Sequence, residues 1–154
     1  MRLLLAPTLL VLVACDAPDP VEIGDTDPGP PEIRLLFPTP AQADSFMFNE
    51  DGTLDLFVVV DILNLDYLPF DSSNPADDVD GQGHWHINAN GASDYIDAPG
   101  SLFFEGTTDK FTSVGAASFV VDLHDNTHDL LEVEGCICSA TYEFQIKAFD
   151  GSGD

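Results

Sequence analysis

The stretch Gly83-His84-Trp85-His86-Ile87 decides the fold of this 154-residue chain. Successive side chains of a β-strand point to opposite faces of the sheet. A strand here would place His84 and His86 on one face, and Trp85 and Ile87 on the other. Trp85 is the only tryptophan of the chain, and its large apolar ring suits a core anchor. The stretch therefore predicts a strand with Trp85 inward and a pair of imidazoles outward.

Further apolar runs, separated by turn signals such as Asn90-Gly91, extend this pattern in both directions. No segment has the periodicity of a helix. Short strands separated by turns predict an all-β fold, an antiparallel immunoglobulin-like β-sandwich of about seven strands. The expected strands are Ile33–Phe37, Leu54–Leu63, His84–Ala89, Ser93–Ile96, Ser101–Glu105, Ala117–Leu123 and Cys136–Phe149.

The order of these strands favours the immunoglobulin-like arrangement by analogy. Such folds carry a core tryptophan on strand C, although the usual disulfide between the sheets is missing here. If His84–Ala89 is strand C and Ala117–Leu123 is strand F, the two pair in one sheet. That pairing is expected to bring His86 close to His124 and His128.

The composition limits the classes of partner that the chain can bind. Against 28 acidic residues stand only 4 basic ones, a formal net charge of −24. Binding nucleic acid requires clustered Lys and Arg, so nucleic acid is excluded as a partner. The same charge repels anionic lipid headgroups, so any membrane attachment has to be covalent or apolar. Cations, in contrast, are attracted.

The N-terminal region predicts export. Arg2 precedes an apolar run, Leu3–Val13, that is too short to span a membrane. We expect a signal peptide over residues 1–14, an acidic, Pro-rich tether over 15–32, the β-sandwich domain over 33–150 and a polar tail over 151–154.

The end of that run, Leu12-Val13-Ala14-Cys15, resembles the lipobox of bacterial lipoproteins. The resemblance implies a lipid on the Cys15 sulfur, attachment to a lipid bilayer, and a location in the cell envelope, periplasmic or surface-exposed. Two or three acyl chains hold a protein on a bilayer stably. The alternative is an ordinary signal peptide with an incidental cysteine.

All four histidines fall in two short stretches. Cα atoms two apart on a strand are about 6.6 Å from one another, a span that two imidazoles can close around one ion. Zinc and copper both accept histidine nitrogens. The sequence therefore predicts a site of His84, His86 and His128, with His124 as a fourth ligand or a partner of a ligand. The alternative is a structural polar cluster.

A second resemblance concerns the same residues. The Gly-His-Trp-His-Ile strand, the Asn-Gly turn and the later Leu-x-x-x-x-His are similar to small exported bacterial domains of the uncharacterised G-H-[HW]-H type. The resemblance covers roughly Ile33–Leu131 and maps onto His84, His86 and His128. His124 lies outside it.

Two other groups of residues are weaker candidates. Cys136 and Cys138 share one strand face, where a disulfide rarely fits; buried free thiols are expected, with a soft Cu(I) site as the alternative. Asp77–Gly81 is similar to a calcium loop, but Ala76 and Ile87 depart from the EF-hand pattern. A solvated acidic loop is expected there. The alternative is a calcium site of Asp71, Asp77, Asp78 and Asp80.

No nucleophile elbow, phosphate loop or paired-carboxylate motif appears in the sequence, so we do not expect an enzyme. The expected function is that of a lipid-anchored, exported binding module for a divalent metal, copper or zinc rather than calcium. The alternative is a surface adhesion or interaction module with structural histidines. The sequence does not identify a protein partner.

Overall fold

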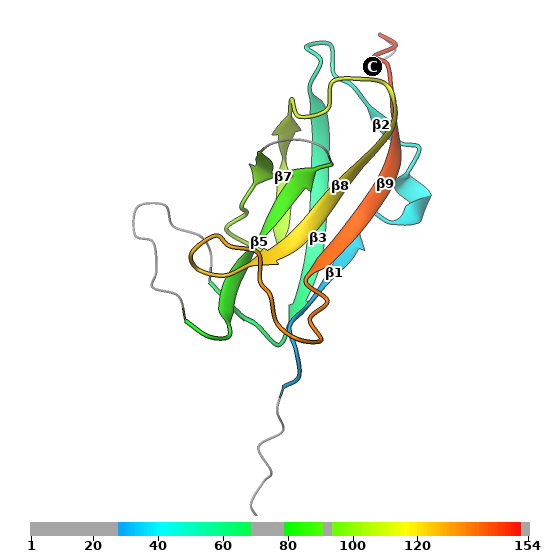
Figure 1. Cartoon of the computed structure of the whole chain (residues 1–154). Helices are drawn as coiled ribbons and strands as arrows, with labels where there is room; N and C mark the ends of the chain where they lie inside the picture. The colour runs from blue at the N-terminus through cyan, green and yellow to red at the C-terminus, as the bar shows by residue number, and fades with distance from the viewer. Residues whose placement is uncertain (1–27, 69–78, 91–93, 152–154) are drawn as a thin grey trace, which may run out of the picture.

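The computed structural model describes residues 28–68, 79–90 and 94–151, which form two β-sheets (Figure 1). The described residues contain no helix of the length and apolarity that a membrane crossing needs. Several sequence predictions lie outside the described residues. They are the signal peptide with Cys15, most of the tether, the tip of the Asn90-Gly91 turn, Asp71, Asp77 and Asp78, and most of the polar tail.

The strands divide between a three-stranded and a six-stranded sheet. The first has the order β1-β3-β7 and is antiparallel, with strands β1 (Glu32–Phe37), β3 (Leu54–Leu63) and β7 (Phe103–Thr108). The second has the order β2-β9-β8-β5-β4, and β6 pairs with β5. Its strands are β2 (Phe46–Met47), β9 (Ser139–Lys147), β8 (Gly115–His124), β5 (Gln82–Ala89), β4 (Asp66–Tyr67) and β6 (Tyr95–Asp97). A single 3-10 turn, η1 (Pro40–Gln42), follows β1.

All seven expected strands are present, but the described residues hold nine, so the expected count is wrong. The two additional strands, β2 and β4, have two residues each and pair in parallel with β9 and β5. Two residues cannot show an alternating pattern, so such strands leave no signal in the sequence. The expected strand over 101–105 begins two residues later and continues to Thr108.

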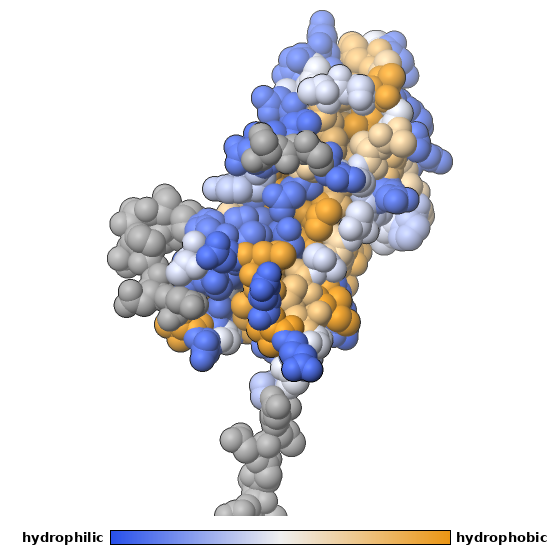
Figure 2. Space-filling model, in the orientation of Figure 1, coloured by the Kyte–Doolittle hydropathy of each residue, from blue (hydrophilic) through white to orange (hydrophobic). Residues whose placement is uncertain are grey.

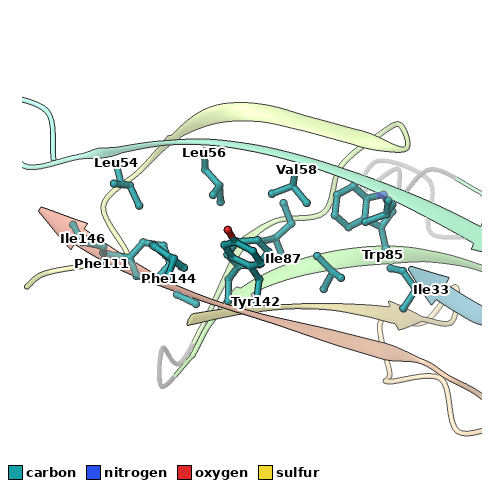
Figure 3. Packing of buried hydrophobic residues seen from close by; sticks show 14 of the residues in the cluster. Ile33, Leu54, Leu56, Val58, Trp85, Ile87, Phe111, Tyr142, Phe144 and Ile146 are labelled. Carbon is teal, nitrogen blue, oxygen red and sulfur yellow. The ribbon is translucent and has the colours of Figure 1, made fainter. Parts of the chain in front are cut away.

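The core lies between the two sheets (Figure 3). The inward face of β3, with Leu54, Leu56 and Val58, packs against residues of β5, β8 and β9. Trp85 is fully buried, and its Nε1 donates a hydrogen bond of 2.8 Å to the Ser101 carbonyl. Ile87 is also fully buried. The predicted inward face of β5 is therefore confirmed.

Strand β5 pairs with β8 in an antiparallel register that sets His84 opposite His124. The predicted pairing of these two strands is therefore confirmed. Gly83, just before the histidines, is required by this pairing because a Cβ atom there would collide with the carbonyl oxygen of His124. A glycine is the residue that permits so close an approach of two backbones.

The prediction of free thiols at Cys136 and Cys138 is wrong, because the two residues form a disulfide. Both lie in the segment between a turn at residues 134–135 and the start of β9, and are not part of a regular strand. The Cα atoms there are 5.2 Å apart, within the range that a disulfide bridges. A disulfide offers no thiolates, so the alternative of a soft Cu(I) site at these residues does not apply to this state.

Candidate metal centre

All four histidines gather on the outer face of the six-stranded sheet. His84 and His86 come from β5, His124 from the end of β8, and His128 from the loop that follows β8. The pairing of β5 with β8 also sets His86 opposite Asp122. Seen from the side of β5, β8 and β9, hydrophilic side chains gather over the β5 end of this sheet (Figure 2). The predicted proximity of His86 to His124 and His128 is confirmed.

His84, His86 and His128 form a compact triad. Their ring centroids are 4.9 Å (His84 to His86), 4.6 Å (His84 to His128) and 5.0 Å (His86 to His128) apart. One donor atom of each lies within 4.8 Å of the other two. A tetrahedral ion with metal–nitrogen bonds of about 2.0–2.1 Å needs donors roughly 3.3 Å apart. The donor atoms of the triad therefore lie near this spacing, and a small adjustment of the rings would suffice to hold one ion.

The imidazoles of β5 are much less accessible than their outward direction suggests. Only 1% of His84 and 3% of His86 is exposed, and the ring of Tyr95 lies 4.7 Å from that of His86. Burial, followed by repulsion from the neighbouring histidines, lowers the pKa of His84 to about 4 and the pKa of His86 to about 3. Both rings are therefore neutral at pH 7, the form in which imidazole binds metal.

The third member of the triad, His128, is positioned by the loop after β8. Asp125 organises this loop, because its Oδ1 accepts hydrogen bonds from the backbone N–H groups of Thr127 (2.8 Å) and Asp129 (3.0 Å). His128 itself has φ 72°, in the left-handed region that a residue with a side chain rarely adopts. Burial also lowers the pKa of His128. Backbone strain of this kind concentrates at functional sites.

His124 differs from the other three histidines in its contacts. Its Nδ1 lies 2.9 Å from the carbonyl oxygen of His128, and its Nε2 lies 3.0 Å from Oδ1 of Asp122. Its ring stacks on that of His86 with centroids 3.8 Å apart. Burial opposes the charged form, but the hydrogen bonds with Asp122 and the His128 carbonyl outweigh it and raise the pKa of His124.

The described residues contain a second group of three close donors, His86, Asp122 and His124. The sequence interpretation missed Asp122, and also Tyr95 and Asn88, which contact the cluster. The alternation that places His86 and His124 outward also places Asn88 and Asp122 outward, so the signal was present. Of the four residues of the alternative calcium site, only Asp80 is described, and it lies on an exposed turn before β5.

No protein-family model, curated protein or solved structure matches this chain. The function therefore has to be inferred from the geometry and chemistry of the histidine cluster.

Proposed function

We propose that this domain binds one divalent transition-metal ion, zinc or copper, through His84, His86 and His128. The observation that carries the proposal is that Nε2 of His84 and Nε2 of His86 face each other at 2.9 Å in a buried site. Only one proton fits between the two facing nitrogens, so one nitrogen carries the proton and the other offers a lone pair. A metal ion that replaces this proton would use the lone pairs of both rings.

The choice of metal follows from the donor atoms. Three neutral imidazoles suit zinc and copper, whereas calcium takes oxygen ligands. At about a hundredfold over its dissociation constant, a bound ion adds roughly 2.7 kcal/mol to the free energy of unfolding. Thermal melts with zinc, copper and calcium test the proposal, and we expect a higher Tm with zinc or copper only. A rise with calcium alone would favour the alternative calcium site of Asp71, Asp77, Asp78 and Asp80. If no metal raises the Tm, the interaction-module alternative is favoured.

His128→Gly separates a ligand from a structural residue. A glycine adopts the left-handed conformation of residue 128 without strain, so we expect the metal-free variant to be as stable as the wild type or more stable. The same variant should lose most of the stabilisation by zinc or copper. Urea denaturation with and without metal measures both quantities. If His128 is structural, the variant will instead be less stable without metal and will respond to metal as the wild type does.

We further propose that the domain is exported and anchored to a lipid bilayer through Cys15, and that it acts as a binding module and not as an enzyme. The support is the lipobox-like sequence and the absence of a recognisable catalytic motif in the chain. Of an immunoglobulin-like arrangement, the strand order supports the pairing of β5 with β8. β5 would be strand C with its core tryptophan, and β8 would be strand F.

Cys15→Ser tests the anchor. Removing the thiol removes the site of acylation, so we expect the variant to lose fatty-acid label and to leave the membrane fraction or remain unprocessed. Metabolic labelling with a radioactive fatty acid in a bacterial host, followed by fractionation, provides the measurement. Cys136→Ser is the matched control and should keep the label. Equal labelling of the wild type and Cys15→Ser would contradict the anchor.

A further inference from the structure

Asp122 and His124 lie directly beside the triad, and we infer that His124 is a positioning residue that fixes His128 rather than a ligand of the ion. The inference rests on the proposed metal site. It assigns different roles to neighbouring residues: the triad holds the ion, and His124 with Asp122 positions the triad.

The first contact that supports this role joins His124 to the backbone of His128. A carbonyl oxygen can only accept, so Nδ1 of His124 donates the hydrogen bond of 2.9 Å to the His128 carbonyl. This bond ties the loop to the end of β8 at the residue with the unusual backbone conformation. The direction of the His128 ring depends on that conformation, so the bond aims the ring at His84 and His86.

The second contact holds His124 itself. Its Nε2 lies 3.0 Å from Oδ1 of Asp122, and the two carboxylate oxygens of Asp122 accept hydrogen bonds of 2.9 and 3.0 Å from Nδ2 of Asn88. A continuous chain of hydrogen bonds therefore runs from Asn88 through Asp122 and His124 to the backbone of His128. Both nitrogens of His124 face oxygen atoms, so neither nitrogen directs a lone pair at an ion.

The stacking of His124 on His86 adds to the positioning. The two rings are 17° from parallel with centroids 3.8 Å apart, so His124 also limits rotation of a ring of the triad. In metal sites generally, partners that orient a ligand through hydrogen bonds change metal affinity about 10–100-fold when they are removed. His124 contacts the backbone of one proposed ligand, His128, and the ring of another, His86.

The test combines zinc affinity with a count of the imidazoles on the ion. Affinity is measured by competition with a chromophoric chelator, and the count by X-ray absorption spectroscopy of the zinc-loaded protein. We expect three imidazoles in the wild type. His124→Phe keeps a stacking ring but removes both nitrogens, so we expect three imidazoles and an affinity about 10–100-fold weaker. Asn90→Ala is the control and should change neither the zinc affinity nor the imidazole count. Asn90 follows β5 and donates a side-chain hydrogen bond to Ser118 of β8, away from the histidine cluster.

Several results would overturn the inference. Four imidazoles in the wild type, or one fewer in His124→Phe than in the wild type, would make His124 a ligand. An unchanged affinity would remove its positioning role. A wild type that binds neither zinc nor copper would overturn the proposed function itself. If His124→Phe does not fold, Asp122→Asn replaces it, with a lower affinity and an unchanged imidazole count expected; the count in the wild type needs no variant.

Discussion

Trp85→Ala is expected to lower the free energy of unfolding by about 3–5 kcal/mol, the usual range for truncating a buried aromatic residue. The indole is fully buried between the two sheets, and its truncation also leaves the Ser101 carbonyl without the hydrogen bond from Nε1. Urea denaturation of the metal-free protein, followed by circular dichroism, gives the free energies.

Phe103→Ala is the matched control for this prediction. Phe103 also lies on a strand, but 53% of it is exposed, so we expect a loss of no more than about 1 kcal/mol. Comparable losses in the two variants would mean that Trp85 does not anchor the core, and that the assignment of the two faces of β5 is incorrect.

The second large effect is a loss of stability in acid for the metal-free protein. The pKa of His84 falls from 6.5 to about 4 on folding, and that of His86 to about 3, chiefly because of burial. As the pH falls below 6.5, these two histidines bind protons in the unfolded chain but not in the folded one. The stability that they contribute is therefore fully present above pH 6.5 and is lost as the pH falls from 6.5 through about 4. For His84 alone the loss is on the order of 3 kcal/mol.

His124 contributes with the opposite sign. Its pKa is raised in the folded state, so its stabilising contribution is fully present below pH 6.5 and is lost as the pH rises through the folded value. We therefore expect a stability maximum close to neutral pH. Urea midpoints measured with a chelator between pH 8 and pH 4.5 provide the test, and His86→Leu should flatten the acid side. A wild-type midpoint that stays constant from pH 6.5 to 4.5 would contradict the burial of these imidazoles.

Much of this fold is predictable from local patterns. The apolar run Leu54–Leu63 indicates a strand, and the alternation of apolar and polar residues around Trp85 indicates both a strand and its inward face, because a strand side chain has only two directions. The same alternation identifies the outward pair His84 and His86. The pairing of β5 with β8, which brings the second pair of histidines to the first, follows from the analogy to a known arrangement and not from local sequence.

The features that the sequence did not predict depend on contacts between distant segments. The burial of His84 and His86 arises because the cluster and Tyr95 close over an outer sheet face, which alternation alone predicts to be solvated. Strands β2 and β4 exist only as short pairings with distant strands. The disulfide between Cys136 and Cys138 is predictable only if β9 is known to begin after Cys138, because two cysteines at this spacing inside a strand do not fit disulfide geometry.

The most direct test of the central claim is the number of zinc ions bound per chain. Equilibrium dialysis of the domain at pH 7 in 0.15 M salt, against zinc buffered by a chelator, weakens long-range attraction of zinc to the acidic surface because salt screens exposed charges beyond about 8 Å. We predict one zinc ion per wild-type chain and none when His84, His86 and His128 are all replaced by alanine. Equal zinc binding by the two proteins, or neither zinc nor copper bound by the wild type, would contradict the proposed site.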